Sequence, residues 1–428
     1  MKKLHLSLAV LAIVGLVGCG DSDSVEIEEI DSITTDISTT ITGQLVDNYV
    51  ENVSYKCGDD STGTTGSNGE FSCTTLPVEF SVGGLRLGSI TTLNSDRQVF
   101  PQDLIGVDRA DTNNGDVLAM AQFLQSCDND NDLSNGIEID EQVISGLESL
   151  DEEFDAINIE AYMAELNLPL VTTEDALEHL ESTTDFTTLV NNSSIPATLK
   201  ESYLSVNSTL DDHTIEHLTF MGNEERLAFD IYNELYKIYP TINQLTNIAT
   251  NGEYPHIEAM QLLIKKYDIK DTELSYIVNP LSYEDTPIEE MEVGVYDIPA
   301  IQNLYNILYA KGSQSAQDAL EVGCMVEVTD INDLDLALDD VREIDAPDVE
   351  AGFEFLIQGS YNHYWAFDSG LKNLGIVDGC CSLGVIDGVD YCKNSDEYPQ
   401  AERGGDGDNG DGEPHGENGG EGHQHGRQ

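Results

Sequence analysis

Residues 223–232 read Asn-Glu-Glu-Arg-Leu-Ala-Phe-Asp-Ile-Tyr, and their apolar side chains recur with the period of a helix. In the helix that this pattern predicts over residues 213–239, Glu224 shares a face with leucine and isoleucine side chains. Glu225 lies on the adjacent stripe, again among apolar residues. At least one of the two glutamates therefore points into the interior of the protein.

Helical periodicity continues from residue 212 to about residue 374. Long segments with one apolar face are predicted at residues 213–239, 241–267, 313–341 and 347–374. A shorter helix is predicted at residues 299–310, after a loop rich in proline and acidic residues. Long helices of this kind favour an antiparallel four-helix bundle.

The other long helices also place a carboxylate or an imidazole on an apolar face. The second carries Glu253 and His256 one turn apart. The third carries Glu327, with Asp330 one turn later, and the fourth carries His363. Buried carboxylates without partners are strongly disfavoured, and several in one core would drive one another neutral. A pair of metal ions removes this conflict, and such ligand sets occur in di-iron and di-manganese bundles.

Several short motifs carry a resemblance to a known family. They are residues 223–232, 253–256, 302–305, 322–333 and 359–363. Through them the segment 212–376 resembles an uncharacterised ferritin-like family related to the rubrerythrins and bacterioferritins. The resemblance implies a ferritin-like bundle with a di-iron or manganese centre. The metal ligands that it implies are Glu224 or Glu225, Glu253, His256, Glu327 and His363, with Asp330 as a further candidate.

Two positions depart from a regular ligand set. Ser360 stands where a second Glu-x-x-His motif would have its glutamate, unless Asp330 substitutes from the third helix. Pro255 directly precedes His256, and a proline inside a helix removes a hydrogen bond at a cost of about 3 kcal/mol. The resulting kink can aim the ligands or destroy the site. The alternatives are therefore an intact metal centre and a bundle whose centre is vestigial.

The N-terminal part shows a different pattern. Short alternating segments at residues 41–46, 52–57, 70–73 and 78–82 are separated by turn residues, including Ser67-Asn68-Gly69. They predict a small β-sandwich over residues 39–95, with a disulfide between Cys57 and Cys73. The segment loosely resembles the transthyretin-like and carboxypeptidase-regulatory-like modules of bacterial surface proteins. The predicted fold class is thus multidomain α+β, a small sandwich followed by a ferritin-like bundle.

An acidic segment follows the sandwich. Asp128, Asp130 and Asp132 alternate with asparagines, and oxygen side chains in this arrangement can converge on Ca²⁺. The spacing departs from an EF-hand loop, so an Asx-rich turn is the alternative. Residues 138–182 are then predicted to be helical.

The beginning of the chain has the pattern of an export signal. Two lysines precede an apolar run that is too short to span a bilayer. Leu16-Val17-Gly18-Cys19 resembles the lipobox of bacterial lipoproteins, so we expect cleavage before Cys19 and acylation there. Gly20 favours the outer membrane, on the periplasmic side or at the cell surface. The alternative is an ordinary signal peptide with an incidental cysteine.

The amino-acid composition limits the classes of molecule that the protein can bind. The chain carries 81 acidic and 18 basic residues, a formal net charge of −63, which excludes nucleic acid and anionic lipid head groups as natural partners. Besides Cys19 it has seven cysteines in a compartment that permits disulfides, an odd number. Pairing of Cys324 with Cys380 or Cys381 is one option.

The expected organisation has eight parts. They are a signal peptide at 1–18, an acidic tether at 19–38, the sandwich at 39–95, an Asp-rich turn and helical region at 96–185, a linker at 186–211, the bundle at 212–376, a Cys-containing extension at 377–403 and a Gly-, His- and acid-rich tail at 404–428.

The favoured function is a membrane-anchored protein with a carboxylate-bridged di-metal centre that handles iron or reactive oxygen. It lacks the Cys-x-x-Cys pairs of a built-in rubredoxin-type electron donor, so its redox partner is unknown. The alternative is a surface binding or matrix lipoprotein that uses the bundle as a scaffold, and calcium-dependent adhesion is a third option. A homo-oligomer fits the bundle, and whether the protein is an enzyme stays open.

Overall fold

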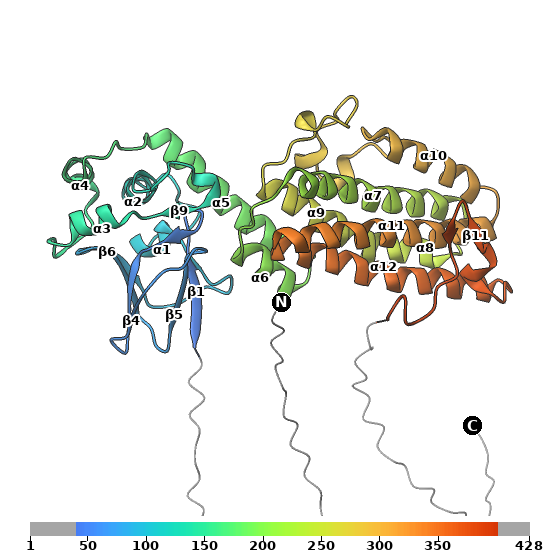
Figure 1. The fold of residues 1–428 in the computed structure, drawn as a ribbon, viewed down its shortest axis with the longest axis horizontal. Helices are drawn as coiled ribbons and strands as arrows, with labels where there is room; N and C mark the ends of the chain where they lie inside the picture. The colour runs from blue at the N-terminus through green and yellow to red at the C-terminus, as the bar shows by residue number, and fades with distance from the viewer. Residues whose placement is uncertain (1–39, 401–428) are drawn as a thin grey trace, which may run out of the picture. The chain divides into compact units, whose positions relative to one another are not determined.

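The computed structural model describes residues 40–400. The expected signal peptide at 1–18, Cys19, the tether at 19–38 and the tail at 404–428 lie outside these residues. The described chain is mixed α+β, with strands confined mainly to its N-terminal part and long helices in its C-terminal part (Figure 1). The fold class is confirmed at this level.

Two small sheets form the strand region. The first has the order β5 (Glu70–Cys73), β1 (Ile41–Leu45) and β8 (Gln98–Val99). The second has the order β10 (Glu152–Glu153), β7 (Leu85–Ile90), β6 (Val78–Val82), β3 (Ser54–Cys57) and β4 (Thr62–Thr64). A separate parallel pair joins β2 (Val50–Glu51) to β9 (Ile137–Glu138).

The strand residues alternate between core and surface as the sequence predicted. In β6, Val78, Phe80 and Val82 are fully buried and the residues between them are partly exposed. Phe80 packs edge to face with Phe71 of the other sheet, with ring centroids 5.2 Å apart. In the predicted Asn68-Gly69 turn, Gly69 has a φ of 69°, a conformation that favours glycine.

Helices share the core of the strand region. They are α1 (Pro101–Ile105), α2 (Gly115–Ser126), α3 (Glu141–Leu147) and α4 (Ile159–Leu166). Buried side chains of α2, among them Met120 and Phe123, pack in one cluster with Phe71 and Phe80. Strands β8, β9 and β10 all lie beyond residue 95, yet they pair with strands that precede it.

Two helices occupy much of the stretch that precedes the predicted bundle. They are α5 (Thr173–Asn192) and α6 (Ala197–Ser205). Thr172 caps α5 by accepting a hydrogen bond from the N–H of Asp175. The expected linker at 186–211 therefore contains the end of α5 and all of α6. Leu199 and Tyr203 of α6 are buried in the core, so this stretch is packed against the rest of the protein.

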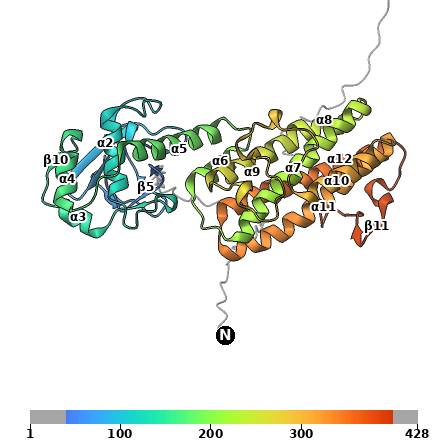
Figure 2. The same cartoon turned by 90° about the horizontal axis from the view of Figure 1, so that it is seen from above.

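The C-terminal helices follow the predicted segments closely. They are α7 (Asp212–Ile238), α8 (Asn243–Ile248), α9 (Tyr254–Lys266), α10 (Pro299–Gly312), α11 (Ala316–Ile344) and α12 (Pro347–Asn373). Helix α7 packs against α9 and α11, α12 packs against α11 and α9, and α10 covers α7 and α11. Figures 1 and 2 show the long helices running side by side. One apolar core fills the space between them.

A π-helical turn, Ala249–Glu253, joins α8 to α9 and resolves the conflict that Pro255 creates. The proline stands in the first turn of α9, where a missing N–H is least costly. The wider π turn lets the backbone continue in the same direction. Glu253 is its last residue and His256 follows one turn later, so the irregularity falls at the predicted ligands.

Three disulfides stabilise the described chain. The predicted bond between Cys57 and Cys73 is present. Cys324 of α11 pairs with Cys380, which attaches the C-terminal extension to the bundle. A third bond joins Cys381 to Cys392 across the small hairpin of β11 (Val385–Ile386) and β12 (Val389–Asp390).

Two further features bear on the sequence predictions. Cys127 is buried and forms no disulfide among residues 40–400. In the same range, no helix combines the length and the apolar composition that crossing a membrane requires.

Candidate metal centre

Carboxylates and imidazoles from five helical elements meet in the core of the bundle. Helix α7 contributes Glu225, the π turn Glu253, α9 His256, α11 Glu327 and α12 His363. Each of these residues is at most 9% exposed. The structure thus brings most of the predicted ligands together in one buried site.

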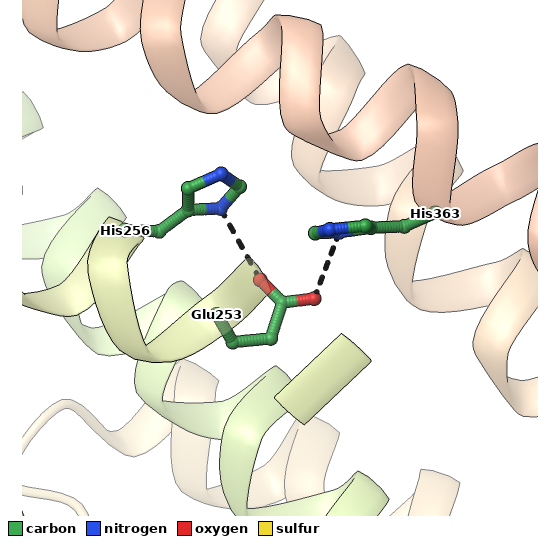
Figure 3. A group of neighbouring side chains, drawn as sticks. All are labelled: Glu253, His256 and His363. Atoms are coloured by element: carbon green, nitrogen blue, oxygen red, sulfur yellow. Dashed lines mark ion pairs between the residues drawn. The ribbon is translucent and has the colours of Figure 1, made fainter. Parts of the chain in front are cut away.

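Glu253 lies between the two histidines (Figure 3). Its Oε2 is 3.3 Å from Nδ1 of His256, and its Oε1 is 3.1 Å from Nδ1 of His363. Among residues 40–400, these are the three residues whose ligand atoms all lie within 4.8 Å of one another. One carboxylate therefore faces two imidazoles, with a different oxygen toward each.

A second carboxylate stands beside each histidine. Glu225 Oε2 is 3.0 Å from Nδ1 of His256, and Glu327 Oε2 is 3.4 Å from Nδ1 of His363. The hydroxyl of Tyr232, itself fully buried, donates a hydrogen bond to the other oxygen of Glu327. Nδ1 of each imidazole therefore faces two carboxylates. One of them contacts only that histidine, and the other, Glu253, contacts both histidines.

Two glycines fix the orientation of the imidazoles. A Cβ atom on Gly359 of α12 would lie 2.3 Å from Nε2 of His256, and one on Gly252 of the π turn would lie 2.2 Å from Nε2 of His363. Each ring therefore rests its Nε2 edge against the backbone of the facing element. This packing turns Nδ1 of both histidines toward the carboxylates.

The sequence carried a signal for these glycines that periodicity did not reveal. Each stands four residues before a histidine, in Gly252-Glu-Tyr-Pro-His256 and in Gly359-Ser-Tyr-Asn-His363. The two segments form a short internal repeat. In the structure the glycine of each segment contacts the histidine of the other.

Asp330 of α11 faces Ser360 of α12, the residue that stands in place of the glutamate of a second Glu-x-x-His motif. Its Oδ2 is 2.8 Å from Oγ of Ser360, and the same hydroxyl lies 3.0 Å from the carbonyl oxygen of Leu356. Asp330 is 6% exposed, and its Oδ1 has no hydrogen-bond partner. A carboxylate of α11 thus lies beside the residue of α12 that would be a glutamate in a regular motif.

Glu224 faces a different neighbourhood from Glu225. It is buried, but the charges that act on it are those of Asp333 and Asp330, whereas those on Glu225 are Glu253, Glu327 and His363. The structure therefore separates the two alternatives that the sequence left open, and it places Glu225 beside the histidines.

The electrostatics of the site couple its groups. Burial, and then Glu253, raise the pKa of Glu225 well above its usual range and that of Glu327 to about 7. Burial acts in the same direction on Glu253, but His363 and His256 outweigh it and lower the pKa of this carboxyl. Burial would lower the pKa of His363, yet Glu253 and Glu327 outweigh it and raise the pKa. The site therefore favours positive charge at its centre.

Three polar atoms of the site lack the hydrogen-bond partners that buried polar groups normally have. Oε1 of Glu225, Oε1 of Glu253 and Nδ1 of His363 make no hydrogen bond of good geometry. The guanidinium group of Arg226 next to them is turned away, since it stacks on the rings of Tyr283 and Tyr296. Unpartnered carboxylate oxygens and imidazole nitrogens at short range are a donor set that fits transition-metal ions.

The predicted calcium ligands, Asp128, Asp130 and Asp132, accept hydrogen bonds from backbone N–H groups. In their loop, Asp130 accepts a hydrogen bond from the N–H of Asp132, and Asp132 accepts from the N–H of Ser134. Asp128 accepts from the N–H of Glu138. The bonds of Asp130 and Asp132 are those of Asx-type turns, the alternative that the sequence offered.

Comparison with known proteins places the site within one family. Residues 214–383 match the family described as an uncharacterized protein domain, DUF2202. The uncharacterized protein MJ0754 of Methanocaldococcus jannaschii is 34% identical over 160 residues, which cover 37% of this chain and 76% of the relative. The chain belongs to this family, and the matched segment contains every residue of the site.

A solved structure is also similar to part of the chain. It is the crystal structure of hypothetical protein MJ0754 from Methanococcus jannaschii, with 31% sequence identity. The likeness covers 40% of this chain and 86% of that one, with a TM-score of 0.33.

Proposed function

We propose that the helical region is a ferritin-like bundle that holds two transition-metal ions bridged by Glu253, in a lipoprotein that handles iron or reactive oxygen at the outer membrane. The observation that carries the proposal is the position of Glu253, whose two oxygens face two different histidines. A carboxylate in this position can bind one ion through each oxygen.

The remaining donors divide into two sets around this bridge. Glu225 and His256 would hold one ion, and Glu327 and His363 would hold the other. Asp330 stands near enough to act on both Glu225 and Glu327, and Ser360 fixes its carboxylate. Each ion would thus have a carboxylate of its own, one imidazole Nδ1, and the carboxylate of Glu253 in common with the other ion. This is the pattern of di-iron and di-manganese bundles.

Several features of the site suit redox chemistry. When bound, an iron or manganese pair supplies two redox-active ions that exchange electrons with dioxygen or peroxide. The surrounding core excludes water, since the ligand side chains are almost fully buried. The Tyr232 hydroxyl orients Glu327 and can exchange a proton with it.

Anaerobic reconstitution with Fe(II) tests the proposal. The full chain is used with His415, His423 and His425 replaced by alanine, to exclude adventitious binding in the tail. We expect about two ions per chain, the content of a di-metal bundle, and less in His256→Ala and in His363→Ala. His213→Ala, an exposed histidine of α7, is the matched control and should keep the full content. A metal content near zero that neither site substitution changes would leave the scaffold alternative in place.

A further inference from the structure

A surface cavity lies between the first part of α7 and the middle of α11. Its volume is about 260 Å³, and its walls include His217 and Met221 of α7 and Asp333 of α11. Asp333 is partly exposed, so one carboxylate of this wall is in contact with solvent.

From this cavity a row of carboxylates leads inward. Glu327, Asp330 and Asp333 follow one another at intervals of three residues on α11, so that each is a neighbour of the next on the surface of that helix. Glu224 of α7, which packs against α11, is next to Asp333 and Asp330. The row therefore runs from the cavity wall at Asp333, past Glu224 and Asp330, to Glu327 of the metal centre.

The two inner members of the row, Glu224 and Asp330, are buried, and each has a carboxylate oxygen without a hydrogen-bond partner. Glu224 is 5% exposed and Asp330 is 6% exposed, and Oε2 of Glu224 and Oδ1 of Asp330 make no hydrogen bond. No salt bridge involving Glu224, Asp330 or Asp333 occurs within residues 40–400, although ion pairs are common elsewhere there. Uncompensated buried carboxylates are costly, so a row of them needs a reason other than stability.

We infer that this row, Asp333, Glu224 and Asp330, is the path by which a divalent metal ion passes from the surface cavity to the buried centre. The inference rests on the proposed function. Carboxylate oxygens bind divalent cations, and successive carboxylates at one-turn intervals can pass an ion inward without returning it to water. The negative charge at the cavity also concentrates cations at its mouth.

The rate of Co²⁺ uptake tests the path. Co²⁺ is added to the metal-free full chain carrying the three tail substitutions, and uptake is followed by the visible absorption of the bound ion. We expect Asp333→Asn and Glu224→Gln to load about tenfold more slowly than the parent chain and to reach the same final content. Asp339→Asn removes the same charge from an exposed position of α11 and should load at the parental rate. Raising the ionic strength should reduce the difference between the variants and the parent.

The outcomes separate this inference from the proposed function. If the parent chain takes up no Co²⁺ at the histidine site, the proposal of a metal centre is wrong. The inferred path is then wrong as well, because there is no site for it to supply. If the parent loads but both variants load at the parental rate, only the path is wrong. A lower final content in Glu224→Gln would make Glu224 a ligand and would also overturn the path.

Discussion

Oγ of Ser360 lies 2.8 Å from Oδ2 of Asp330, so the serine that interrupts the second Glu-x-x-His motif positions a carboxylate from the neighbouring helix. Ser360→Ala should therefore leave the ligands in place but release Asp330. We expect metal affinity to fall about tenfold, because partners that orient ligands commonly contribute that much. Isothermal titration of the metal-free chain measures the change. Unaltered affinity would show that the orientation of Asp330 does not matter for binding.

The two glycines that face the histidines should be as important as the ligands. Gly359→Ala places a Cβ 2.3 Å from Nε2 of His256, so the ring must shift from its present position beside Glu225 and Glu253. We expect metal content to fall although no ligand is removed. Gly115→Ala, where a Cβ would meet nothing within 4 Å, is the control. Full metal content in Gly359→Ala would mean that the ring position is not fixed by this contact.

The strand region contains a buried carboxyl group, Asp47, whose ionisation depends on pH. Burial raises the pKa of Asp47 from 3.8 to about 6, against the opposing effects of His179 and Gln125. The folded state therefore holds this proton more tightly than the unfolded state does, and stability falls as pH rises from about 4 to about 6. The loss amounts to about 3 kcal/mol if the whole shift acts on unfolding.

Asp47→Asn isolates this contribution. The amide keeps an oxygen that can accept the hydrogen bond from Gln125 and has no charge to bury. Denaturant unfolding of both proteins between pH 4 and pH 7.5 should show the variant gaining stability relative to the parent as pH rises. A difference that stays constant across this range would contradict the assignment to Asp47.

Acylation at Cys19 remains a prediction from the sequence, since this residue lies outside the described part of the chain. Cells grown with a fatty-acid analogue should label the parent protein and not Cys19→Ala, because the lipobox cysteine supplies the acceptor. The labelled protein should fractionate with the outer membrane. Equal labelling of the two proteins would remove the lipoprotein assignment.

Periodicity predicted the long helices well, because each buries one apolar stripe in the core. It could not choose between Glu224 and Glu225, because α7 packs against both α9 and α11 and both stripes are buried. Apolar periodicity could not predict the consequence of Pro255 either, because the proline falls in the first turn of α9, directly after a π turn. Strands such as β8 (Gln98–Val99) have two residues, too few to show alternation, so their pairing could not be predicted.

The bridging role proposed for Glu253 can be tested by the metal content per chain after Fe(II) reconstitution. In the chain without tail histidines, Glu253→Gln keeps the size of the side chain but removes the bridging charge. We expect this variant to lose both ions, whereas His256→Ala and His363→Ala should each lose mainly the ion on their own side. A Glu253→Gln protein that is folded and still binds about two ions, as a di-metal bundle does, would show that Glu253 is not the bridging ligand.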